Sequence, residues 1–189
     1  MICPTWKPLA RLLLPVAASV PFWLAPAETG EAKEARAPAY IGSVACAACH
    51  EAESGAWRDS HHAWAWRPPE PRNVLGDFSD TTFTHNGVTS RFSTRDGRFI
   101  VRTDGPDGKL TDFEVKYTAG VTPLQQYLVE TAPGRLQQLD VTWDTERKEW
   151  LHLYPEQDLP HTNGLHWTGP YKTWNARCTE CHATDFHKN

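Results

Sequence analysis

Methionine is almost absent from this sequence of 189 residues, and so is cysteine outside two short clusters. Met1 is the only methionine, so no thioether inside the chain is available as a metal ligand. Four of the five cysteines form two short clusters, and the fifth is Cys3 near the N-terminus. No cysteine pair is therefore left over for a structural disulfide, and stability must come from a core or from a bound group.

Long apolar runs and an excess of positive charge are also missing. The main apolar stretch, 12–25, is short for a membrane span and contains Pro15 and Pro21. The formal net charge is −4. This balance argues against nucleic acid and against an anionic membrane surface as partners.

The N-terminus has the layout of a secretory signal. Lys7 and Arg11 precede the apolar stretch, and Ala25-Pro-Ala27 offers a small-x-small cleavage site. We expect residues 1–27 to be removed, with an uncleaved anchor as the alternative. The mature protein would then be periplasmic or extracellular and have no membrane span. Residues 28–39 are small and charged and indicate a flexible leader, followed by one domain over 40–189.

Two pentapeptides define the chemistry of the chain. Cys46-Ala-Ala-Cys49-His50 and Cys178-Thr-Glu-Cys181-His182 are both C-x-x-C-H motifs, the attachment signature of c-type haem. Each cysteine pair can form thioethers with the vinyl groups of one haem, and the following histidine is then the proximal iron ligand. The sequence therefore predicts two covalently held haem c groups with their iron.

Other chemistry of paired cysteines fits less well. A zinc ribbon places its two C-x-x-C pairs about 15–20 residues apart, whereas here the pairs lie at opposite ends of the domain. A dithiol redox motif normally occurs once and beside a βαβ pattern, which this sequence does not show. Haem attachment is the better interpretation because a histidine follows both pairs directly.

The region between the motifs predicts strands and tight turns. Asn86-Gly87 lies in the middle of 81–92 and indicates a hairpin, and Asp96-Gly97 marks a second turn. Residues 123–129 are ambiguous between strand and helix. The β-rich insertion is expected over about 80–155.

The regions around the motifs predict helix. Residues 44–62 have few helix breakers, and a 3.6-residue period places His50, Trp57 and His61 on one face. We therefore predict an α+β fold, in which haem-binding helical segments at both ends flank an antiparallel β-meander.

Aromatic residues near the motifs are candidates to pack on the porphyrins. Trp167 and Trp174 precede the second motif. Trp57 follows the first, and an ordinary core role is equally open for it.

The second axial ligand of each iron must be sought among the remaining histidines, since no internal methionine exists. On a continuous helix, His61 would lie about 16 Å from His50, so His61 or His62 is expected to serve the second haem. For the first haem, His166 is the first choice, followed by His161 or His85. Two histidine ligands would give comparatively low reduction potentials.

At this point the chain resembles a known family. Tyr40-Ile-Gly-Ser43, the first motif, and Trp57-x-x-Ser60-x-His62-Ala63 resemble the opening module of multihaem cytochromes c of the cytochrome c-554-like group. In that module the histidine two residues after the serine is typically an axial ligand, which implies His62 rather than His61.

Segments further along resemble longer multihaem cytochromes that also carry tetratricopeptide repeats. They are 120–127, 150–155 and 166–169, and with them the resemblance covers most of 40–185. Those relatives continue with further haem motifs, so the chain is expected to be a short form, a fragment, or one subunit of a larger array. Neither the lysine-ligated motif of the nitrite reductases nor the cross-linking tyrosine of the hydroxylamine oxidoreductases is identifiable, so their enzyme chemistry is not implied.

Electron transfer between redox partner proteins is the function these features favour. One alternative is a haem enzyme acting on a small nitrogen or sulfur oxyanion or on peroxide, which needs an open iron and an acid/base residue such as His85 or His161. A five-coordinate haem that binds a gas is another. Further cytochrome subunits, or a second copy of this chain, are candidate partners.

Overall fold

The strands of this protein follow one another in a single antiparallel sheet. A computed structural model describes residues 41–183. The expected signal and leader, 1–27 and 28–39, lie outside the described residues. The strands are β1 (Ser79–His85), β2 (Val88–Arg95), β3 (Arg98–Asp104), β4 (Leu110–Ala119), β5 (Leu124–Ala132), β6 (Arg135–Gln138), β7 (Val141–Asp144) and β8 (Glu149–His152).

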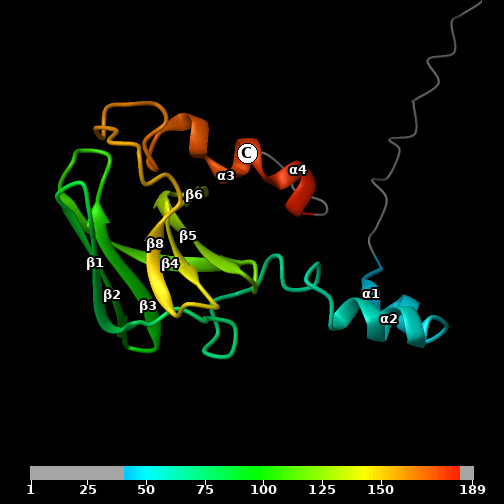
Figure 1. Cartoon of the computed structure of the whole chain (residues 1–189). Helices are drawn as coiled ribbons and strands as arrows, with labels where there is room; N and C mark the ends of the chain where they lie inside the picture. The colour runs from blue at the N-terminus through cyan, green and yellow to red at the C-terminus, as the bar shows by residue number, and fades with distance from the viewer. Residues whose placement is uncertain (1–40, 184–189) are drawn as a thin grey trace, which may run out of the picture. The chain divides into compact units, whose positions relative to one another are not determined.

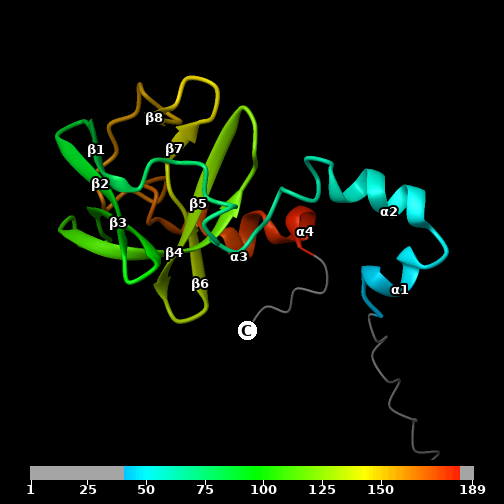
Figure 2. The ribbon, with the colours of Figure 1, turned by 90° about the horizontal axis from the view of Figure 1, so that it is seen from below.

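The sheet curls until its two ends approach each other. Its strand order is β1-β2-β3-β4-β5-β7-β8, with β6 paired to β5 (Figures 1 and 2). The Nε1–H of Trp150 in β8 donates to Oγ1 of Thr81 in β1 at 3.2 Å. The result is a nearly closed, barrel-like sheet.

Tight turns set the register of the first three strands. Asn86 and Gly87 both have positive φ, 45° and 78°, and Asp96 and Gly97 have 51° and 75°. Two consecutive left-handed residues give the twist that suits a two-residue hairpin. The predicted hairpin at Asn86-Gly87 and the predicted turn at Asp96-Gly97 are confirmed, and all of the ambiguous stretch 123–129 except its first residue lies in β5.

Aromatic rings fill the inside of the sheet. Phe92 and Tyr127 are fully buried, and the Trp150 ring stacks on Phe92 with centroids 3.6 Å apart. Phe78 meets both Phe92 and Tyr127 edge-on. These large rings supply most of the apolar area removed from water.

The helices of the described residues are short. They are α1 (Ser43–Ala47), α2 (Glu51–Arg58), the 3₁₀ turn η1 (Pro170–Lys172), α3 (Trp174–Arg177) and α4 (Thr179–His182). No helix within 41–183 is long and apolar enough to cross a membrane.

The predicted α+β fold is wrong. The protein is mostly antiparallel β, and the α-helices at the two ends of the described residues have only four to eight residues each, rather than forming long haem-binding helical segments. A continuous helix over 44–62 does not form, because the chain leaves helical geometry at His50 (φ −121°, ψ 54°) and α2 ends at Arg58. Neither α1 nor α2 buries any residue. Without a packed face a helix this short gains little stability, and periodicity alone does not extend it.

Candidate functional site

Both C-x-x-C-H motifs contain the same pair of backbone hydrogen bonds. The carbonyl of Cys46 accepts hydrogen bonds from the amides of Cys49 (3.2 Å) and His50 (3.0 Å). The carbonyl of Cys178 accepts from Cys181 and His182 at the same two distances. Each motif thus closes one backbone turn over its two cysteines and the histidine that follows. All four cysteines are free thiols.

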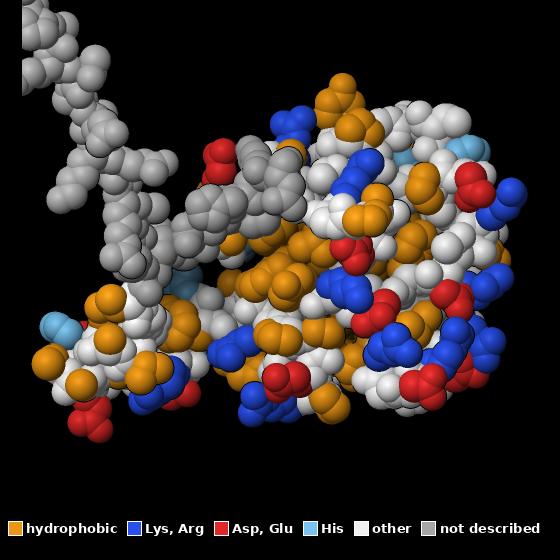
Figure 3. All heavy atoms as spheres, turned by 180° about the vertical axis from the view of Figure 1, so that it is seen from behind, with side chains coloured by type: hydrophobic (Ala, Val, Ile, Leu, Met, Phe, Trp, Pro, Cys, Tyr) orange, Lys and Arg blue, Asp and Glu red, His pale blue; other side chains and the backbone are white. Residues whose placement is uncertain are grey.

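The first motif lies in a segment without a core of its own. Cys46, Cys49 and His50 are exposed, and so are the apolar side chains of Val44 (87%) and Trp57 (51%). Figure 3 shows apolar side chains spread over the surface of this segment. Exposed apolar groups around two thiols and an imidazole fit a haem, whose flat apolar ring would cover them.

The second motif is anchored to the sheet. The side-chain oxygen of Asn175 in α3 accepts from the amide of Leu136 in β6 (2.8 Å), and its Nδ2–H₂ donates to the carbonyl of Gly134 (3.0 Å). Just before α3, Lys172 forms an ion pair with the buried Asp140. Cys178 is half-buried, and burial, followed by the neighbouring Cys181, raises the pKa of its thiol.

Three of the candidate distal histidines are exposed. His61 and His62 lie in a turn that follows α2, with the carbonyl of His61 accepting from the amide of Trp64. His161 is exposed in the loop after β8. Their ring nitrogens have no hydrogen-bond partner among the described residues that would compete with iron.

His166 is in a different situation. Its ring is 7% exposed, its Nε2 lies 2.7 Å from Oδ2 of Asp104, and its Nδ1 lies 2.8 Å from Oγ1 of Thr168. The amide of Thr168 also donates to Nδ1, which assigns the ring proton to Nε2. His166 can ligate iron only by giving up one of these bonds.

The predicted haem-packing tryptophans also differ from one another. Trp167 is 5% exposed, meets Phe113 edge-on and donates from Nε1 to the carbonyl of Asp104 at 3.0 Å, so it belongs to the sheet core. Trp174 is 4% exposed and stacks on Trp66. Only Trp57 presents a large open surface.

Trp66 was not singled out by the sequence. Its ring stacks on Tyr117 of β4 and on Trp174 of α3, with centroids 4.2 Å and 4.1 Å apart. No local pattern pointed to it, because all three rings come from distant parts of the chain.

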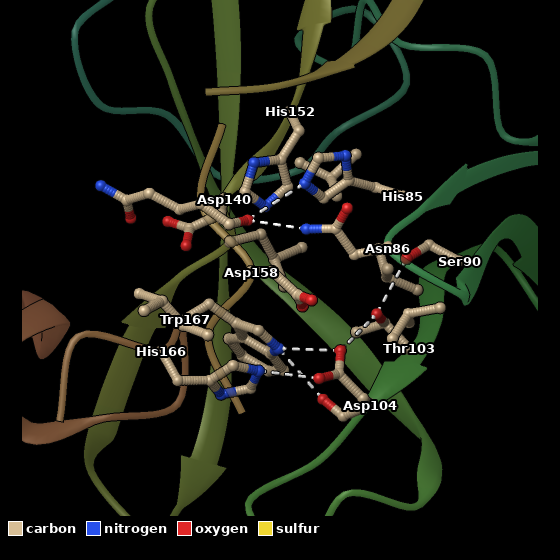
Figure 4. Close-up of a pocket in the computed structure, with 16 residues that line it drawn as sticks. His85, Asn86, Ser90, Thr103, Asp104, Asp140, His152, Asp158, His166 and Trp167 are labelled. Atoms are coloured by element: carbon tan, nitrogen blue, oxygen red, sulfur yellow. Dashed lines mark hydrogen bonds and ion pairs between the residues drawn. The ribbon is translucent and has the colours of Figure 1, made fainter. Parts of the chain in front are cut away.

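A separate polar cavity opens between the β1–β2 turn, β8 and the loop before the second motif (Figure 4). It measures about 90 Å³. The rings of His85 and His152 stack at 4.0 Å on one side of it, and Asp104 and His166 lie on the other. Burial, and then the neighbouring His85, lowers the pKa of His152. Neither haem motif lines this cavity.

Within 41–183 no three His, Cys, Asp or Glu side chains form a metal-binding group. The two thiols and one imidazole of each motif instead fit an iron that is already bound in a porphyrin. Two thiols hold the ring, and a single histidine offers its nitrogen to iron.

Comparison with known proteins agrees with this assignment. Residues 45–83 match the family model described as cytochrome c554 and c-prime. The matched stretch runs from α1 through the first motif into β1, which is less than half of the chain. It supports a c-type cytochrome, an electron carrier with covalently attached haem c. No curated protein and no solved structure matches the chain significantly.

Proposed function

We propose that this protein is an exported dihaem cytochrome c that transfers electrons between redox partner proteins. The observation that carries the proposal is the matching pair of hydrogen bonds to the carbonyls of Cys46 and Cys178, which closes a turn in both C-x-x-C-H motifs. If one turn is competent to attach haem, its duplicate is competent too. The family match covers the first motif only. The proposal of a second haem therefore depends on the likeness between the two motifs.

His50 and His182 are the proposed proximal ligands. Both are exposed and follow their cysteines directly. The opposite ligands are proposed to be histidines, with His62 first, then His61 and His161. Within 41–183 the ring nitrogens of these three have no hydrogen-bond partner, whereas His166 would have to release Asp104 or Thr168.

The protein's own residues do two things for the haems. The two cysteines of each motif would hold one porphyrin ring through thioether bonds, and histidines would supply the ligands of its iron. A bound haem then supplies one-electron chemistry at iron, which two histidines keep at a lower potential than histidine with methionine would. Docked redox proteins, further cytochrome subunits or a second copy of the chain are the proposed partners.

The haem count tests the proposal directly. The full chain, with residues 1–27, is produced in a haem-attaching periplasm, and haem per chain is measured by the pyridine haemochrome assay and intact mass. Wild type is expected to carry two haems. The matched double variants Cys46→Ala/Cys49→Ala and Cys178→Ala/Cys181→Ala should each carry one.

The same double variants act as controls for each other. If the second double variant still carries as much haem as wild type, Cys178 and Cys181 hold none, and the dihaem proposal fails. Low-temperature EPR of the ferric protein then tests ligation. Two low-spin signals are expected, while a high-spin signal near one iron equivalent would favour the enzyme or gas-binding alternative for that haem.

A further inference from the structure

The ring of Trp66 is enclosed on both faces. Tyr117 stacks on it with planes 25° apart, and Trp174 stacks on it with planes 21° apart. Both centroids lie about 4 Å from that of Trp66. Two rings this close and this nearly parallel to a third must occupy its opposite faces. Trp66 is therefore the middle layer of a three-ring stack.

The three rings come from three parts of the protein that matter for the haems. Trp66 lies on the segment that leads from the first motif into the sheet. Tyr117 lies on β4, the middle of the sheet. Trp174 begins α3 and stands four residues before Cys178.

Hydrogen bonds of the neighbouring residues, from the backbone of Arg67 and Thr118 and from the side chain of Asn175, hold the stacked rings to the sheet. Next to Trp66, Arg67 and Thr118 exchange two amide–carbonyl hydrogen bonds, of 3.0 Å and 2.9 Å. Next to Trp174, Asn175 is bonded to both Leu136 and Gly134. Because its two neighbours are held by the sheet, the rotamer of Trp66 is locked by packing, as a supporting residue of a functional site requires.

We propose that Trp66 is a positioning residue that holds the segment of the first haem motif in a fixed relation to the second. The inference rests on the proposed dihaem function. The segment of the first motif carries the indole itself. The segment of the second motif contacts one face of the indole through Trp174, and the sheet contacts the other face through Tyr117. The stack thereby fixes the separation and relative tilt of the two haems, on which electron transfer between them depends.

The first experiment needs no haem. In the full chain produced without haem attachment, two stacked indoles give a paired near-ultraviolet circular dichroism signal. Trp66→Ala and Trp174→Ala should each abolish the signal of this stack, measured as the difference from wild type, because the edge-on pair of Trp143 and Trp150 contributes equally in every variant. Trp64→Ala is the matched control, because Trp64 lies two residues away, contacts Arg67 and takes no part in the stack; it should leave the signal in place. Persistence of the signal in Trp66→Ala would overturn the inference.

The second experiment uses the haem-loaded protein. Two haems held at a fixed tilt give a split circular dichroism band in the Soret region. This splitting should be lost in Trp66→Ala, retained in Trp64→Ala, and largely restored in Trp66→Phe, which keeps a flat ring in the stack. Rescue by phenylalanine separates positioning from a general loss of folding.

The outcomes distinguish the inference from the proposed function. If wild type carries only one haem, the dihaem function fails and the positioning role falls with it. If wild type carries two haems and Trp66→Ala keeps the split band, the positioning role alone is overturned. Should Trp66→Ala fail to fold, Trp66→Leu, which fills the space without a stacking ring, gives the same comparison, and loss of its split band supports the role.

Discussion

At the scale of single residues, the candidate histidine ligands differ in whether their ring nitrogens are hydrogen-bonded to the protein. Exposed His62 has no hydrogen-bond partner for its ring nitrogens in the part of the chain that the structure describes, while both ring nitrogens of His166 are hydrogen-bonded, to Asp104 and Thr168. Asp104 is in turn surrounded by donors, because Trp167 and Thr103 also reach its carboxylate. The interaction with His166 helps to hold the pKa of Asp104 below its usual value against the opposing effect of burial.

This contrast predicts different effects of two alanine variants. His166→Ala should lower the free energy of unfolding by about 1–3 kcal/mol, because it removes a buried hydrogen-bonded partner of a carboxylate. It should leave the EPR spin state of the loaded protein unchanged. His62→Ala should leave stability nearly unchanged and convert one iron to high spin.

Urea unfolding and EPR of the same samples measure both effects. The variant His166→Gln, which keeps a hydrogen-bonding group at that place, serves as the control and should lose less stability. A high-spin iron in His166→Ala would show that His166 leaves Asp104 or Thr168 to bind haem.

At the scale of elements, side chains at the turns stabilise the hairpins in addition to the backbone hydrogen bonds between their strands. Between β7 and β8, Oδ1 of Asp144 accepts from the amides of Glu146 (2.9 Å) and Arg147 (2.8 Å). These bonds, with that of Arg147 first, lower the pKa of Asp144. A carboxyl with a lowered pKa in the folded state stabilises the protein above its unfolded pKa of about 3.9, and this contribution is lost as the pH falls.

The lowered pKa of Asp144 determines how the stability contributed by the β7–β8 turn changes with pH. Asp144→Asn keeps an oxygen that can accept both amides but carries no charge. Between about pH 5 and pH 3 its stability should therefore fall less steeply than that of wild type. Asp144→Ala, which loses the acceptor, should be less stable than both at pH 7.

Thermal unfolding at a series of pH values measures how steeply the stability of each protein falls with pH. The other carboxylates remain in every variant, so the difference between wild type and Asp144→Asn isolates Asp144. Parallel curves for the two proteins would contradict the assigned role.

At the scale of the whole molecule, the closure of the sheet depends on contacts between its first and last strands. Trp150 of β8 stacks on Phe92 of β2 and donates to Thr81 of β1. It is 8% exposed and also meets Trp143 edge-on. One side chain therefore joins the two edges of the sheet to its core.

Truncating this side chain should weaken the whole fold. Trp150→Ala is expected to lower the free energy of unfolding by about 3–5 kcal/mol, the cost of a large cavity in a packed core. Thr81→Val removes the acceptor of the Trp150 indole together with the bond that the Thr81 hydroxyl donates to the carbonyl of Asp77 (2.6 Å), and it should cost about 1–2 kcal/mol.

Urea unfolding followed by far-ultraviolet circular dichroism compares the two variants. Equal losses would mean that the hydrogen bond, rather than the packed ring, closes the sheet.

The sequence by itself determined what is local. The motif that predicts covalent haem attachment consists of five consecutive residues, and the turns at Asn86-Gly87 and Asp96-Gly97 depend on two residues each. Such features need no distant partner, so they can be recognised without a structure. The helix predicted around the first motif was wrong because its stability depended on a packed face, and α1 and α2 have none.

Only the tertiary structure decided which distant residues meet. The stack of Tyr117, Trp66 and Trp174, and the pairing of Asp104 with His166, each join positions more than fifty residues apart. The sheet closes because buried rings from strands at both of its ends pack together. Contacts of this kind depend on how the whole chain buries its apolar surface, and no short stretch of sequence specifies them.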